Sequence, residues 1–248
     1  MTGSRRRTIT ESAQAWVYDH EPRSRTEELV RHALSDFLAG RYFGWAEHLK
    51  RIHAARRSMY GDTRNVTEAA EVEDQDLEIV DLIARTATNP EKGRLEFHLA
   101  RSLAPGTVLE LGTSIGISAA YFALGLQSDG GGRVVTLDRS IARTTIARRI
   151  WSDIGVDNID QVLGPFDEVL PPTIAKIEDL RLAYIDGNHQ KDPTLRYQRA
   201  VTKHMSSGVI MFDDIRWSEG MEAAWAEIEA IHDSTVDLGP VGLVMLDS

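Results

Sequence analysis

A strand, a glycine turn and a helix follow one another without a gap over residues 107–121, in the sequence TVLELGTSIGISAAY. The closely spaced apolar residues within 108–111 predict a buried strand, because turn-forming residues bound it on both sides. Gly112 and Gly116 bound the turn, and helix-forming residues with an apolar face follow from Ile117. Such a turn presents backbone N–H groups at a helix N-terminus, where a ligand can approach closely. The stretch therefore predicts an α/β fold with a ligand site at the end of a central strand.

Strands and helices alternate after this turn, which is typical of a doubly wound parallel sheet. A helix with one apolar face is predicted at 221–231, before a final hairpin around Gly239-Pro240. We expect a Rossmann-like sheet of seven strands, mostly parallel, with the hairpin antiparallel at the C-terminus. The expected strands are 108–111, 134–137, 158–163, 180–185, 209–212, 235–238 and 241–246.

The first part of the chain is predicted to be helical. Helices at 25–38 and 45–59 each carry an apolar stripe, and two more are expected at 77–86 and 90–103, the last capped by Asn89. We therefore divide the chain into an N-terminal helical extension, residues 1–92, and a catalytic domain, residues 93–248. Because two apolar stripes exceed what a short lid over the active site needs, we expect the extension to contribute to a homodimer.

Composition excludes several classes of partner and site. A net charge of −10, from 28 basic and 38 acidic residues, disfavours nucleic acid as the main partner. The absence of cysteine rules out disulfides and thiolate metal sites. No apolar run approaches the roughly 20 residues of a membrane span, and none follows the three arginines at 5–7 as in an export signal. We expect a soluble, cytoplasmic protein that does not bind membranes.

The glycine spacing and the nearby acids indicate which ligand the turn binds. A Gly-x-Gly-x-x-Gly dinucleotide pattern is not present, since Ser114 stands between the two glycines. Glu110 lies near the end of a buried strand, where a carboxylate is costly without a partner. Asp138 ends the second predicted strand, where it can accept hydrogen bonds from ribose hydroxyls or cap the next helix.

A second group of acids follows the fourth and fifth predicted strands. Asp186 ends one strand and Asp213-Asp214 end the other, and adjacent strands lie about 5 Å apart. Three carboxylates this close repel one another unless a cation joins them, and an all-oxygen site suits Mg²⁺ or another divalent cation. They could instead cap helices or bind solvent and the amine of a cofactor. His189 follows closely, and a neutral imidazole near pH 7 suits a general base.

These motifs resemble those of a known enzyme family. The pattern Glu-Leu-Gly-Thr-x-x-Gly-x-Ser at 110–118 resembles class I S-adenosylmethionine-dependent methyltransferases, in particular the catechol O-methyltransferase-like branch. The segments 185–189 and 213–221 resemble bacterial members of that class, including macrocin-type O-methyltransferases of macrolide sugars.

The resemblance implies a set of site residues. It places S-adenosylmethionine on Glu110, Gly112, Thr113, Ser114, Gly116, Ser118, Asp138, Gly164, Phe166 and Asp186. It also implies a metal on Asp186, Asp213 and Asp214, the last being a departure because catechol O-methyltransferases have asparagine there. His189 occupies the position of their catalytic lysine, and a histidine is the base in the macrolide-sugar enzymes.

The function expected from these features is O-methylation of a small hydroxylated molecule such as a natural product, sugar or phenol. The expected catalytic residues are His189 and Asp186. The acceptor oxygen would bind the metal, which favours the oxyanion, and His189 would take the proton. Two alternatives stay open at this point. One is a nicotinamide-dependent oxidoreductase, which the missing glycine pattern disfavours, and the other is a non-catalytic cofactor-binding scaffold, which the retained acids and histidine disfavour.

Overall fold

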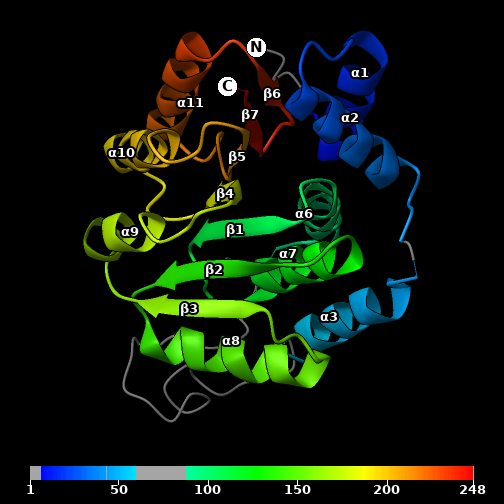
Figure 1. The fold of residues 1–248 in the computed structure, drawn as a ribbon, viewed down its shortest axis with the longest axis vertical. Helices are drawn as coiled ribbons and strands as arrows, with labels where there is room; N and C mark the ends of the chain where they lie inside the picture. The colour runs from blue at the N-terminus through cyan, green and yellow to red at the C-terminus, as the bar shows by residue number, and fades with distance from the viewer. Residues whose placement is uncertain (1–6, 43, 60–87, 248) are drawn as a thin grey trace, which may run out of the picture.

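The chain folds around one seven-stranded sheet (Figure 1). The structure, a computed structural model, describes residues 7–42, 44–59 and 88–247, so the predicted helix at 77–86 lies outside the described residues. The strand order is β3-β2-β1-β4-β5-β7-β6, with β7 antiparallel to both of its neighbours. This confirms the predicted Rossmann-like sheet and its C-terminal hairpin. The strands are β1 (Gly106–Leu111), β2 (Gly132–Asp138), β3 (Ile159–Leu163), β4 (Leu180–Ile185), β5 (Gly208–Phe212), β6 (Thr235–Asp237) and β7 (Gly242–Leu246).

The register of the parallel strands brings their carboxyl ends level with one another. Leu111 is the partner of both Leu137 and Ile185, and Ile185 is the partner of Phe212. The residues that follow these strands therefore leave the sheet at one edge. This alignment gathers residues from the loops that follow these strands into one place, as is usual for ligand sites in open α/β sheets.

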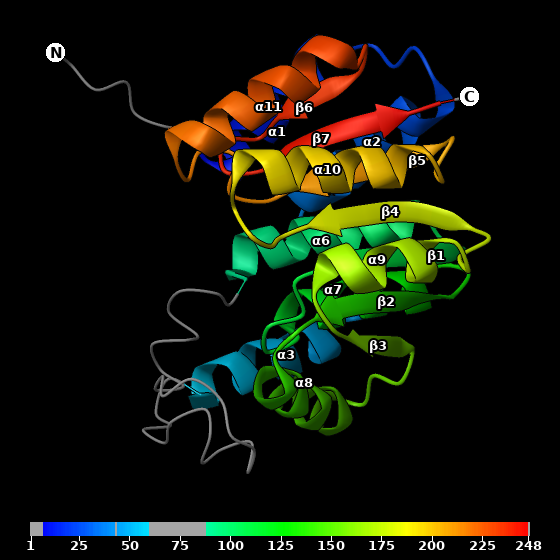
Figure 2. The ribbon, with the colours of Figure 1, turned by 90° about the vertical axis from the view of Figure 1, so that its left-hand side faces the viewer.

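Helices cover both faces of the sheet, and alternating strand residues divide the core between them (Figures 1 and 2). Leu182 and Tyr184 of β4 pack with one set of helices, whereas Ala183 and Ile185 pack with the other, as the two-residue period of a strand requires. The first set is α1 (Ile9–Asp19), α2 (Arg25–Leu38), α3 (Ala46–Met59), α6 (Pro90–Ser102), α7 (Ile117–Ser128) and α8 (Ile141–Ile154). The second set, in front of the sheet in Figure 2, is α9 (Phe166–Ile174), α10 (Lys191–Thr202) and α11 (Glu219–Ile231).

Local sequence signals account for the starts of several helices. Asn89 caps α6 through its side-chain oxygen, with Pro90 at the first position, as predicted. Helices α1, α9 and α10 were not predicted. The signal for α1 was a capping box, in which Thr8 and Glu11 bond each other's backbone N–H groups. The signal for α9 was hidden by the prolines at 171 and 172, which lie inside that helix.

The N-terminal helices pack onto the rest of the chain. The apolar stripe of α2, including Val30, Leu34 and Phe37, is buried in the same core as α6 and α7, and so is Ile52 of α3. The homodimer therefore stays a prediction that needs a surface other than these stripes, and the division at residue 92 also stays a prediction. Within the described residues, no helix has both the length and the apolar character needed to cross a membrane.

Candidate active site

A cavity of about 650 Å³ opens at the carboxyl edge of the sheet. Loops after five strands, the starts of α1 and α6, and the hairpin turn contribute to it. Its size is within the usual range for small-molecule and cofactor sites. The lining residues are Ile9, Asn89, Lys92, Gly112, Ser114, Asp138, Arg139, Arg143, Gly164, Pro165, Phe166, Asp167, Asp186, Gly187, Asn188, His189, Tyr197, Asp213, Asp214 and Pro240.

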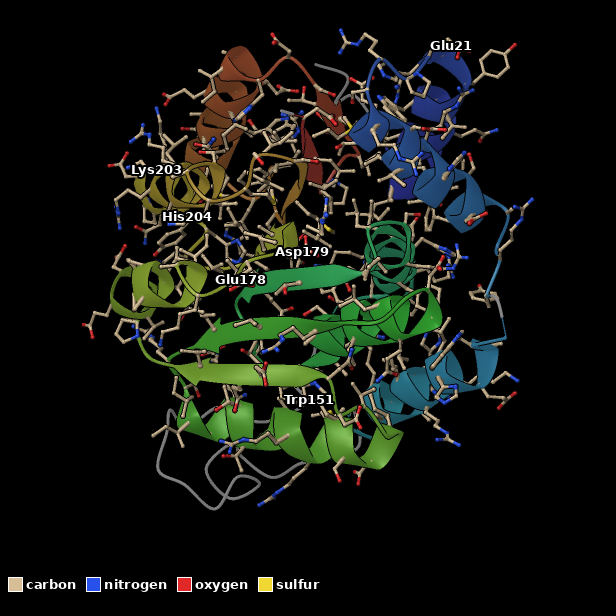
Figure 3. The ribbon with its side chains drawn as sticks, viewed as in Figure 1. Glu21, Trp151, Glu178, Asp179, Lys203 and His204 are labelled. Atoms are coloured by element: carbon tan, nitrogen blue, oxygen red, sulfur yellow. The ribbon has the colours of Figure 1, made fainter. Side chains whose placement is uncertain are left out.

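At its two glycines the turn packs too closely to admit a side chain. Gly112 has φ +117°, and a Cβ there would lie 2.1 Å from the carbonyl oxygen of Asp186. Gly116, at φ +77°, accepts a hydrogen bond on its carbonyl from Nε1 of Trp151 at 2.8 Å. Trp151, labelled in Figure 3, comes from α8. The two glycines thus bring the turn against β4 on one side and α8 on the other.

Glu110 lies beneath the turn and outside the cavity lining. Its two oxygens accept hydrogen bonds from Ser118 Oγ and Thr136 Oγ1, each at 2.5 Å, and Thr136 also bonds Thr113 Oγ1 at 2.6 Å. Burial raises the pKa of Glu110 to about 7, against these hydroxyl donors, which lower it. The network joins β1, β2 and α7. Direct contact of Glu110, Thr113, Gly116 and Ser118 with a cofactor stays a prediction.

The other predicted cofactor residues line the cavity. Asp138 accepts hydrogen bonds from the backbone N–H groups of Ser114 at 2.8 Å and Ser140 at 2.9 Å, so its carboxylate lies beside the turn. Gly164 and Phe166 line the cavity after β3. The Phe166 ring packs over Gly187, where a Cβ would lie 2.5 Å from ring atom Cε2.

The strand-end acids form an interaction network with a lysine, a tyrosine and a histidine. Lys92 of α6 makes an ion pair with Oδ2 of Asp213, which also accepts a hydrogen bond from Tyr184 OH at 2.9 Å. The same hydroxyl is 3.1 Å from Oδ2 of Asp186, whose Oδ1 lies 3.5 Å from Nε2 of His189. The other ring nitrogen of the histidine, Nδ1, lies 3.9 Å from Asp214 Oδ2. The sequence prediction is confirmed in that all three aspartates and His189 meet at one edge of the sheet.

Charge is distributed unevenly within this network of side chains. Burial alone would raise the pKa of Asp213, but the Lys92 ammonium and the Tyr184 hydroxyl outweigh it and lower that pKa. Burial also lowers the pKa of Lys92, and here the Asp213 carboxylate reverses the effect, so the lysine pKa rises above its ordinary value. For Asp186 and Asp214, burial and then the neighbouring Asp213 raise the pKa. Lys92 and Asp213 are therefore the charged pair of the network.

The predicted magnesium site does not fit this arrangement. The three aspartates share an edge, yet across the described ranges no group of three or more His, Asp or Glu side chains is disposed to hold a metal ion. Lys92 and Tyr184 already bond Asp213, so part of the expected ligand set is engaged by protein donors.

Two functional candidates were missed in the sequence. Lys92 stands four residues before Glu96 on a helix, a spacing that is usual for surface ion pairs, but Lys92 is mostly buried and Glu96 fully so. Tyr184 had a usable signal, since residues two apart on a strand share a face and Asp186 follows it by two.

Backbone strain is concentrated at the cavity. Ser114, Asn188, His189 and Asp214 have φ between +40° and +67°, and they are the non-glycine residues with positive φ among those described. All four line the cavity. Such conformations cost about 1–3 kcal/mol each and persist where the surroundings enforce them, often at functional sites.

Comparison with known proteins is consistent with this geometry. Residues 109–215 match a family described as a methyltransferase domain, a segment that includes the glycine turn and the strand-end acids but not Lys92. A catechol O-methyltransferase from Mycobacterium tuberculosis is 29% identical over 151 residues, which cover 60% of this chain and 66% of that protein. A transmembrane O-methyltransferase from Propithecus coquereli is 33% identical over 84 residues, which span only 30% of that protein and 33% of this chain.

Solved structures share the fold over most of the chain. An O-methyltransferase from Bacillus cereus, in complex with SAH, is 19% identical with a TM-score of 0.59, covering 86% of this chain and 97% of that chain. TomG from Streptomyces achromogenes, an O-methyltransferase in complex with SAM, is 18% identical with a TM-score of 0.59, covering 91% and 100%. At these identities the likeness establishes the fold.

Proposed function

Because this chain belongs to the class I S-adenosylmethionine-dependent methyltransferases, in their catechol O-methyltransferase-like branch, we propose that it methylates a hydroxyl oxygen of a small molecule. The observation that carries the proposal is that the glycine turn, the strand-end acids and His189 line the same cavity. A methyl donor held by the first would face an acceptor held by the second.

Cofactor binding is supported by the shape and chemistry of one half of the cavity. The turn residues Gly112 and Ser114, the Asp138 carboxylate and the Phe166 ring all line the cavity and would hold S-adenosylmethionine. Asp138 would accept from the ribose hydroxyls, the role a strand-end acid takes in this kind of fold. When bound, the cofactor supplies an electrophilic methyl group, whose bond to sulfur breaks as the bond to the acceptor oxygen forms.

Proton removal is supported by the surroundings of His189. Its ring lines the cavity and has carboxylate oxygens 3.5 Å and 3.9 Å from its two nitrogens. When the ring takes the acceptor proton it becomes positively charged, and that charge in turn favours the ionised forms of the Asp186 and Asp214 carboxyl groups beside it. The rigid sheet edge then keeps the deprotonated oxygen aligned for attack, which is the main remaining requirement of the reaction.

The finer expectations stay predictions. The acceptor belongs to the class of small hydroxylated molecules, with sugar, phenol and other natural-product hydroxyls as candidates. The cytoplasmic location and the homodimer likewise stay predictions from the sequence. The expected Mg²⁺ at Asp186, Asp213 and Asp214 is not carried into the proposed reaction, because Lys92 engages Asp213.

Isothermal titration calorimetry with S-adenosylhomocysteine and with NAD tests the proposal. We expect one molecule of S-adenosylhomocysteine to bind per chain and raise the melting temperature, and NAD to do neither. Asp138→Ala should weaken binding by about 1–3 kcal/mol through lost hydrogen bonds. Binding of NAD without S-adenosylhomocysteine would overturn the proposal in favour of the oxidoreductase. If S-adenosylhomocysteine binds, transfer of a labelled methyl group to a panel of phenols and sugars identifies the acceptor.

A further inference from the structure

We propose that the Lys92 ammonium occupies the cation position of the strand-end acids and takes the place of a divalent metal ion there. A catalytic role for this ammonium rests on the proposed function, in which it is the positive charge that faces the acceptor. Lys92 lies in the first turn of α6, and its Nζ reaches Asp213, 121 residues further along the chain.

The placement of Lys92 on its helix is itself unfavourable. The N-terminus of a helix carries partial positive charge, so a cation in the first turn is repelled. Asn89 nevertheless caps this turn by accepting from the backbone N–H of Lys92 at 2.9 Å, and only 12% of the lysine side chain is exposed. A buried cation at such a place needs an anionic partner, and Asp213 provides it.

Asp213 in turn needs a positive partner. Its side chain is buried, and a buried carboxylate is costly unless it is paired and hydrogen-bonded. Lys92 supplies the charge, and Tyr184 OH supplies a further hydrogen bond at 2.9 Å to the same oxygen, Oδ2. A divalent ion at this oxygen would either have to displace the ammonium or stand next to its positive charge.

The remaining acids are connected to this pair without completing a metal site. Tyr184 OH bridges from Asp213 to Asp186 at 3.1 Å, and Asp186 and Asp214 both face His189. Lys92 and His189 line the same cavity, so an oxygen that loses its proton to the histidine shares that space with the ammonium. An ammonium has three N–H donors, of which the bond to Asp213 uses one.

Mn²⁺ titration followed by electron paramagnetic resonance tests the assignment without any methyl acceptor. We expect the wild-type protein to bind no stoichiometric Mn²⁺. Lys92→Ala should gain one Mn²⁺ site, with an affinity about tenfold or more above any residual binding to the wild type. The double variant Lys92→Ala/Asp213→Asn should lose that site again. Lys50→Ala is the matched control, because it removes a lysine from an exposed ion pair with Glu47 on α3, and it should behave as wild type.

Two results would overturn the assignment: tight binding of one Mn²⁺ per wild-type chain, or no gain of Mn²⁺ affinity on removal of the lysine. If Lys92→Ala does not fold, Lys92→Met removes the charge with less loss of volume, and the wild-type titration decides independently of either variant. S-adenosylhomocysteine binding is measured on the same samples. Its failure would count against the proposed function, whereas the Mn²⁺ result alone bears on Lys92.

Discussion

His189 is held between two carboxylates on a strained piece of backbone. Its φ of +40° follows that of Asn188 at +67°, and Asn188 is anchored by donating from Nδ2 to the Tyr197 hydroxyl at 2.6 Å. The strained turn presents the imidazole to the cavity while Asp186 and Asp214 lie beside its two nitrogens. This placement is the one that the proposed role of His189 as the general base requires.

Replacing this imidazole should remove the base and leave the cofactor half of the cavity intact. We expect His189→Ala to lower kcat by roughly 10²–10⁴-fold, the usual contribution of a general base, with the dissociation constant of S-adenosylhomocysteine unchanged. His204→Ala is the control, since His204 is an exposed histidine after α10, labelled in Figure 3. Full activity of His189→Ala would assign proton removal to another group.

Substitution of Gly112 tests the close approach of the turn to the end of β4. We expect Gly112→Ala to lower the free energy of unfolding and to abolish S-adenosylhomocysteine binding, because its Cβ would lie 2.1 Å from the Asp186 carbonyl oxygen. Gly131→Ala separates this clash from backbone strain. It has φ +83° with no atom near its Cβ, so only strain of about 1–2 kcal/mol is expected there. Equal losses of stability by urea denaturation in the two variants would mean that the clash is relieved.

Helix α2 is joined to the C-terminal hairpin through its first turn. Thr26 Oγ1 donates to the Leu246 carbonyl oxygen at 2.9 Å, and Ser234 Oγ donates to Oε1 of Glu27 at 2.6 Å. Glu27 also accepts from the backbone N–H of Arg23 at 2.6 Å and is paired with His20 at 2.9 Å. These bonds place a buried carboxylate at the junction of the N-terminal helices and the last strands.

This junction should weaken in acid. Burial alone would raise the pKa of Glu27, but the bonds from Ser234, Arg23 and His20 outweigh it and lower the pKa to about 2, from 4.5. A lowered carboxyl pKa stabilises the fold above the unfolded-state value, and the contribution disappears as pH falls from about 4.5 to 2.

Comparison of wild type with Glu27→Gln at several pH values measures this contribution. The wild type should be more stable by about 3 kcal/mol near neutral pH, and the difference should vanish near pH 2. Glu21→Gln, at a strongly exposed position labelled in Figure 3, should change stability by less than about 0.5 kcal/mol. A difference that does not depend on pH would assign the effect of Glu27→Gln to lost packing.

Among the described residues, helices α1, α2 and α3 share one hydrophobic core with the rest of the fold. Ile9, Val30, Leu34, Phe37 and Ile52 are buried in a core that also contains α6, α7 and strand residues. Removal of the N-terminal helices would expose the other side of that core to water. It would also remove Ile9, which lines the cavity.

A chain shortened to residues 88–248 should therefore fail to fold cooperatively. We expect aggregation and a broad thermal transition by differential scanning calorimetry, because the newly exposed apolar surface is contiguous. The full chain in the same buffer is the reference. A soluble fragment with a sharp transition and intact S-adenosylhomocysteine binding would instead support an independent domain close to the predicted boundary at residue 92.

Local patterns in the sequence determined the glycine turn, the seven strands, the cap of α6 and the acids at the strand ends. Each depends on backbone conformation or on periodicity within a few residues, so each is visible without knowledge of the fold. They sufficed to predict that Asp186, Asp213 and His189 would meet, because the ends of parallel neighbouring strands share an edge.

Only the tertiary structure decided what the acids bond and which residues the N-terminal helices cover. Lys92 reaches Asp213 across 121 residues, and nothing near Lys92 in the sequence distinguishes it from a surface lysine. Burial is the physical reason for the difference. Inside the fold an unpaired carboxylate and an unpaired ammonium are each costly, so the two groups that packing brings together must neutralise one another, whatever their separation along the chain.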